Sequence, residues 1–146
     1  MRAVIQRVSE ASVTVDSEVI GHIKKGLLIL LAIHNNDTKD QLDWMVSKIS
    51  KLRIFSDDEG KMNKSVMDVG GELLVVSQFT LYGDARKGTR PSYIESAGPE
   101  KAEAMYNEFV EKIRAFSSLK TETGEFAAMM DVALVNDGPV TIILDK

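Results

Sequence analysis

The stretch 131–145 constrains the fold most, because it consists of two apolar runs separated by four turn-forming residues. Residues 131–135 and 140–144 are rich in β-branched and aliphatic side chains, and Asn-Asp-Gly-Pro lies between them at 136–139. Two apolar runs separated by turn-forming residues predict a strand, a turn and a second strand. Proline cannot donate to a strand ladder, so the chain has to bend or expose an edge at the Gly-Pro pair. Taken alone, the pattern favours a surface turn.

Length and composition predict one cytoplasmic domain without membrane association. The chain has 146 residues, of which 44% are hydrophobic and 27% charged, as in typical globular proteins. The longest apolar run, residues 27–33, is far shorter than the roughly 20 residues of a membrane-spanning helix. The first ten residues alternate polar and apolar side chains and do not resemble a signal peptide. Cysteine is absent, which excludes disulfides and zinc-thiolate sites.

The pattern of apolar residues predicts an α+β fold. Alternation at period two indicates half-buried strands, and the wholly apolar run 27–33 indicates a strand covered on both faces at the centre of a sheet. Apolar residues three and four positions apart indicate two helices. The predicted helices are 38–52 and 98–116, and the predicted strands before the last stretch are 3–8, 11–15, 17–23, 27–33, 53–55, 72–79 and 119–123. We expect a single domain with a mixed or antiparallel sheet, or an open barrel, closed by dimerisation.

A polar segment lies at the end of the mostly apolar strand predicted at 72–79. It contains Ser77, Gln78, Phe79 and Thr80. Rigid scaffolds present functional groups at strand ends, and these residues supply hydroxyls, an amide and main-chain N–H groups. The alternative is a strand end that satisfies its own backbone, and these residues alone do not decide between the two.

Two further clusters are candidates for binding. Arg86, Lys87 and Arg90 lie in one glycine-containing loop. The net charge of -4 argues against coating of nucleic acid by bulk electrostatics, but this focused patch could bind it; a solvated loop is the commoner meaning. Met129 and Met130 lie in a break between strands, where they could line an apolar pocket for a flat ring.

The familiar catalytic and cofactor motifs are absent. His22 and His34 have no motif around them, and no glycine-rich phosphate loop is present. The acidic run at 57–59 lacks the alternating ligand spacing of a calcium loop. We therefore predict no cofactor and no metal site.

Two segments together resemble a known family. Ser-Gln-Phe-Thr-Leu at 77–81 and Asn-Asp-Gly-Pro-Val-Thr at 136–141 are similar to the two signature motifs of the D-aminoacyl-tRNA deacylases, also called D-tyrosyl-tRNA(Tyr) deacylases. The resemblance extends over essentially the whole chain and includes 6–8, 52–55, 60–63 and 87–92. One departure is visible: members of the family often have Gly-Ala-Asp-Met where this chain has Ala-Ala-Met-Met, at 127–130.

The resemblance implies a homodimer that hydrolyses the ester between a D-amino acid and the 3′-terminal adenosine of tRNA. It implies that the Gly138–Pro139 bond is cis and enters the active site of the partner subunit. There, two carbonyl oxygens would accept from the substrate's α-ammonium and block the direction of an L side chain. Clearance of glycine mischarged on tRNA(Ala) would follow, because glycine has no side chain to reject.

The resemblance also implies roles for the candidate residues. Main-chain N–H groups of Phe79 and Thr80 would stabilise an oxyanion. No basic residue lies beside Thr80 in the sequence, so we expect Thr80 to position the substrate while the terminal 2′-hydroxyl assists an attacking water. Ser77 and Gln78 would orient the substrate. The remaining binding residues would be Phe126 with Met129 or Met130 around the adenine, and Arg86, Lys87 and Arg90 at phosphates.

Two other functions remain open from the residues alone. The first is a non-catalytic dimeric RNA-binding module, in which the basic loop binds tRNA and Gly138–Pro139 only shapes the interface. The second is a different ester or amide hydrolase that uses Thr80 as a nucleophile.

Overall fold

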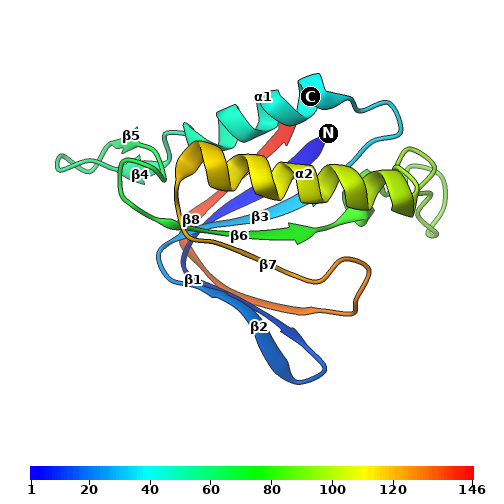
Figure 1. The fold of residues 1–146 in the computed structure, drawn as a ribbon, viewed down its shortest axis with the longest axis horizontal. Helices are drawn as coiled ribbons and strands as arrows, with labels where there is room; N and C mark the ends of the chain where they lie inside the picture. Colours follow the sequence, from blue (N-terminus) through cyan, green and yellow to red (C-terminus); the bar gives the residue numbers. More distant parts are fainter.

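The computed structural model describes residues 1–146 and places two helices on one face of a strongly bent sheet (Figure 1). The helices are α1 (Lys39–Ser50) and α2 (Pro99–Ser117), and a 3₁₀ helix, η1 (Phe79–Tyr82), follows the sixth strand. The strands are β1 (Arg2–Val15), β2 (Glu18–Ile23), β3 (Gly26–Ala32), β4 (Phe55–Ser56), β5 (Met62–Lys64), β6 (Glu72–Ser77), β7 (Thr121–Thr123) and β8 (Asp131–Asp145). No helix is long and apolar enough to cross a membrane.

The sheet is organised by β1, which pairs with three other strands. The first half of β1 pairs antiparallel with β3, and its second half pairs antiparallel with β2. On its other side, β1 pairs antiparallel with β8 along nearly the whole length of β1. On the other side of β3, the pairs β3–β6 and β6–β7 are parallel. Parallel neighbours need crossover connections, and α1 and α2 supply them. The predicted α+β class, a mixed sheet with two main helices in one domain, is confirmed.

The central strand β3 is buried on both faces. Leu27, Ile29 and Leu31 belong to the larger apolar core beneath the helices, whereas Leu28 belongs to a smaller core on the other face. The buried residues of the smaller core are Val8, Ala11, Val13, Ile23, Leu28, Leu74 and Val76. A strand covered on both sides needs a continuous apolar sequence, which explains the run at 27–33.

Local sequence signals define the ends of both helices. The Thr38 hydroxyl accepts from the N–H of Asp40, while the Gln41 side chain accepts from the N–H of Thr38 at 2.9 Å, which completes a capping box for α1. Pro99 opens α2, and Ser118 ends it with a left-handed φ of 57°. Both helices begin and end within two residues of their predicted bounds.

The interpretation of residues 131–145 as strand, turn and strand is wrong. They form the single strand β8, which pairs with β1 from Asp145 opposite Arg2 to Asp131 opposite Thr14. The turn-forming residues make a bulge within this strand instead of a turn between two strands, because residues 137–140 all lie opposite Arg7. Likewise, the two predicted strands at 3–8 and 11–15 are one continuous strand.

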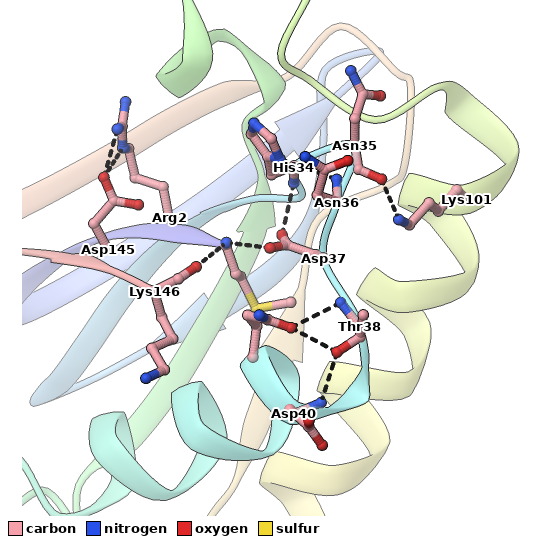
Figure 2. A network of polar contacts seen from close by, with 12 residues as sticks. Arg2, His34, Asn35, Asn36, Asp37, Thr38, Asp40, Lys101, Asp145 and Lys146 are labelled. Carbon is pink, nitrogen blue, oxygen red and sulfur yellow. Dashed lines mark hydrogen bonds and ion pairs between the residues drawn. The ribbon is translucent and has the colours of Figure 1, made fainter.

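The α-ammonium group of Met1 forms a buried ion pair that joins three segments (Figure 2). It donates to Oδ1 of Asp37 at 2.5 Å and to the main-chain carbonyl of Lys146 at 2.6 Å. The other carboxylate oxygen of Asp37 accepts from the N–H of His34 at 2.7 Å. The pair therefore ties the start of β1 to the end of β8 and to the connection between β3 and α1.

We predict that Asp37→Ala lowers the free energy of unfolding by about 3 kcal/mol, because it leaves a buried cation without its counter-charge. Asp43→Ala is the matched control, since the ion pair of Asp43 with Lys112 is exposed and such pairs contribute less than about 1 kcal/mol. Urea unfolding measures both variants. Equal, small losses would contradict a structural role for the Met1–Asp37 pair.

Candidate active site

A cavity of about 760 Å³ opens at the carboxyl ends of β3 and β6. Its walls come from these strand ends, from η1, from the start of α2 and from the loop before β8. Most of the lining is apolar and includes Ile33, Ala97, Pro99, Ala102 and Val132. A largely apolar cavity with a few polar groups is the usual form of a site for a small organic group.

The polar segment predicted to be functional lines this cavity. All four residues, Ser77, Gln78, Phe79 and Thr80, contribute to its wall. Ser77 ends β6, and the N–H of Gln78 donates to the carbonyl of Leu31 at 2.8 Å before η1 begins. The parallel pairing of β6 with β3 therefore holds the segment at the cavity.

Two main-chain N–H groups at this wall are free of the hydrogen bonds of η1. The first bond of the 3₁₀ turn runs from the N–H of Leu81 to the carbonyl of Gln78. The N–H groups of Phe79 and Thr80 precede this bond, so the helix offers them no acceptor. Because they lie at the cavity, they can donate to an oxygen that gains negative charge there.

The cavity contains no acid or base beside Thr80. The Thr80 hydroxyl accepts a hydrogen bond from Nε2 of Gln78. Among the lining residues Tyr93 is the only one with a titratable side chain, and no His, Asp, Glu or Lys is present. No group there can take the proton of the Thr80 hydroxyl. No three His, Cys, Asp or Glu side chains lie close enough to hold a metal ion.

The three predicted adenine-side residues also line the cavity, in different positions. Phe126 is half-buried and packs against Tyr106, whose ring centroid lies 6.0 Å away. Met130 is half-buried against the smaller core, whereas Met129 is 93% exposed at the mouth. Ala127 has a φ of 63°, a conformation that favours glycine, which gives a physical reason for the glycine in the related motif.

The second signature segment does not belong to this cavity. Gly138 and Pro139 are exposed in the bulge of β8, and the peptide bond between them is cis. Arg7, opposite the bulge, is in register with Leu27 of β3 and through it with Leu73 near the start of β6. The cavity begins three residues later, at Val76 near the end of β6, which corresponds to about 10 Å along the sheet. Figure 1 shows the bend of β8 on the side opposite the carboxyl end of β6.

Side chains from elsewhere in the chain hold the bulge in place. Nε of Arg7 donates to the carbonyl of Asp137 at 3.3 Å and lies 3.1 Å from its carboxylate, while Nη1 donates to the carbonyl of Ile54 at 2.6 Å. Nδ2 of Asn136 donates to the carbonyls of Arg7 and Val140, each at 3.0 Å. The bulge is therefore a built feature of the fold and not a solvated turn.

The basic loop presents fewer free charges than its sequence suggests. The guanidinium of Arg86 donates two hydrogen bonds to the Asp84 carboxylate, at 2.7 and 2.9 Å. This contact lowers the pKa of the Asp84 carboxyl to about 2. Lys87 and Arg90 form no ion pair within the chain, and none of the three cations lines the cavity.

Two residues with clear positions at these sites escaped the sequence analysis. Tyr93 lines the cavity, but it lies in a loop without periodicity, so no pattern distinguishes it. Arg7 supports the bulge, and its signal was present, because it belongs to the related segment 6–8. Its partner residues lie more than 40 positions away, so its function requires the fold to be known.

Comparison with known proteins agrees with this geometry. The model of the D-Tyr-tRNA(Tyr) deacylase family matches residues 4–145. The chain is 58% identical to a D-aminoacyl-tRNA deacylase of Chloroherpeton thalassium and 59% identical to one of Thermosipho melanesiensis, over all of this chain and 96% and 97% of theirs. A solved structure described as c-Myc DNA unwinding element binding protein has a TM-score of 0.95 and 46% identity, over 100% of this chain and 99% of that one. The chain therefore belongs to the D-Tyr-tRNA(Tyr) deacylase family and is a hydrolase of aminoacyl-tRNA.

Proposed function

We propose that this deacylase removes D-amino acids from tRNA as a cytoplasmic homodimer, in which the Gly138–Pro139 bulge of one subunit closes the cavity of the other. One observation carries the proposal. The cavity and the bulge lie at opposite ends of β6, so the bulge of a chain does not reach the cavity of the same chain. A second copy supplies the missing element.

The exposed edge of β8 supports a contact between two copies. β8 pairs with β1 on one side only, and the 15 residues of its other edge are unpaired. A long unpaired edge is a place where another chain adds. Val135 and Ile143, exposed apolar residues on either side of the bulge, extend this surface. A dimer formed along β8 would carry the bulge of each subunit towards its partner.

The cavity accepts the terminal adenosine in this proposal. Its apolar walls suit an adenine ring between Phe126 and Met130, with Met129 at the mouth. Ser77 and Gln78 then orient the ester beside the free N–H groups of the following residues. These N–H groups stabilise the negative charge that develops on the carbonyl oxygen during hydrolysis.

Water is the attacking group in this mechanism. Thr80 has no neighbouring base, so it positions the ester through its hydroxyl, which already accepts from Gln78. The 2′-hydroxyl of the terminal ribose assists the water, because it lies next to the ester in the substrate itself. The ester bond breaks, and the products are the free amino acid and tRNA.

Chirality is selected by exclusion in this proposal. Main-chain carbonyl oxygens at Gly138 and Pro139 of the partner accept from the α-ammonium group and occupy the direction of an L side chain. A D side chain points away from them, so its size matters little. A rigid backbone clash rejects every L residue alike, whereas apolar pockets discriminate by only about 1 to 3 kcal/mol per methylene.

The basic loop contributes contacts to the phosphates of tRNA. Lys87 and Arg90 are available for this role because they form no ion pair, whereas Arg86 shares its charge with Asp84. Such contacts position the RNA without reading its sequence.

We predict that Thr80→Ala keeps kcat within about tenfold of the unchanged enzyme, because a positioning hydroxyl is worth on the order of 1 kcal/mol. Thr123→Ala, a half-buried threonine of β7 outside the cavity, is the matched control. Single-turnover deacylation of D-tyrosyl-tRNA measures both. A reduction on the order of a thousandfold or more would identify Thr80 as the nucleophile instead.

Three substrates test the proposed selectivity directly. D-tyrosyl-tRNA and glycyl-tRNA(Ala) should be hydrolysed by the purified chain, and L-tyrosyl-tRNA at least about a hundredfold more slowly, because only the L side chain meets the bulge. Release of the amino acid from each tRNA is the measurement. Equal cleavage of the two tyrosyl esters would overturn selection by exclusion, and an intact glycyl ester would remove glycine from the proposal.

A further inference from the structure

Two exposed aromatic side chains form a pair at the mouth of the cavity. The rings of Phe79 and Tyr93 lie 5.2 Å apart at an interplanar angle of 66°. Both residues line the cavity, yet Phe79 is 53% and Tyr93 is 40% exposed. The pair therefore presents ring surface to solvent directly beside the cavity.

The position of Tyr93 is fixed although its ring is exposed. A β-carbon on Gly83 would lie 3.0 Å from Cε1 of Tyr93, so the ring packs closely against the backbone that follows η1. On either side of Tyr93 the loop is tied down. Ser92 and Asp84 exchange both main-chain hydrogen bonds, and Nδ2 of Asn35 donates to the carbonyl of Ile94 at 2.6 Å. A ring held in this way is preorganised for a flat partner.

The same loop carries the free cations of the basic cluster. Lys87 and Arg90 lie between the two residues that anchor the loop, Asp84 and Ser92, and form no ion pair. Figure 1 shows the loop 83–96 beside the start of α2, at the end of the sheet where the cavity opens. Aromatic rings next to unpaired cations are the usual surface for unpaired nucleic acid, whose bases stack on the rings while cations contact phosphates.

We propose that Phe79 and Tyr93 form a stacking platform for the nucleotide that precedes the terminal adenosine, and that Lys87 and Arg90 bind the phosphates of this unpaired 3′ end. The inference rests on the proposed function, in which the adenosine fills the cavity. The preceding base then leaves the cavity at its mouth, where the aromatic pair lies. Stacking accepts any base, so this surface serves all tRNAs alike.

A comparison of two substrates tests the platform. D-tyrosyl-tRNA has the preceding nucleotides, whereas 3′-O-D-tyrosyl-adenosine has none. Tyr93→Ala should lower kcat/KM for D-tyrosyl-tRNA at least about fivefold, mainly through KM, and leave the nucleoside ester unchanged. Tyr93→Phe keeps the ring and should restore the activity. Phe116→Ala is the matched control, because Phe116 is 42% exposed at the far end of α2.

Salt dependence tests the role of the cations separately. Replacing both Lys87 and Arg90 by Gln should reduce the slope of log KM for D-tyrosyl-tRNA against log salt by about 0.7 for each phosphate that the variant no longer binds. The nucleoside ester should show no such change, since it has no phosphate. An unchanged slope for the tRNA would contradict phosphate binding by these two cations.

Several outcomes would overturn the proposal. Equal reductions of kcat/KM on both substrates would mean that Tyr93 only shapes the cavity. No reduction on either would mean that the ring pair binds something other than RNA, such as another protein. If the unchanged enzyme failed to cleave D-tyrosyl-tRNA, the proposed function itself would be wrong, and this result is distinct from any effect of Tyr93.

Discussion

The pairing of β1 with β8 is the constraint on which the rest of the structure depends. Both strands are long, and they stay paired over nearly their whole lengths, with register shifts only at Arg7 and at Ser9 of β1. One half of β1 joins β3 under the helices, and the other half joins β2 over the smaller core. The bulge at residues 137–140 lies near the end of the half that pairs with β3. Arg7 and Asn136 fix its shape, so the element proposed to read chirality is part of the sheet itself.

The same sheet separates the two parts of the proposed active site. The cavity lies at the carboxyl ends of the parallel strands β3 and β6, where the polar segment 77–80 begins at the end of β6. The bulge lies towards the opposite end of β6. Because both are built on paired strands, neither can move to the other within one chain. In the proposed dimer this separation has a chemical consequence, because each subunit would contribute a cavity and complete the site of its partner.

The sequence predicted those features that local chemistry determines. The run 27–33 indicated the central strand, and apolar spacing with Thr38 and Pro99 indicated both helices. The segment 77–80 was correctly placed at a strand end, and the structure brings it together with Phe126 and both methionines. The predicted turn at 136–139 was wrong because residues of β1, more than 120 positions away, hold this segment within one continuous strand. No local pattern could show that Tyr93 faces the cavity or that Arg86 is bound to Asp84.

A mixed dimer tests the cross-subunit site most directly. Gly138→Ala disturbs the bulge, since φ is 122° and the new β-carbon would lie 2.9 Å from Nη2 of Arg7; Ala128→Trp fills the cavity. The first homodimer should lose about tenfold or more of its D-over-L selectivity, and the second should be inactive. In a co-expressed heterodimer, the Gly138→Ala subunit has an open cavity and the Ala128→Trp subunit has an unchanged bulge. This bulge would close that cavity, so we expect deacylation with full D-over-L selectivity to return. Heterodimers with the poor selectivity of Gly138→Ala alone would show that each chain completes its own site, and would contradict the account.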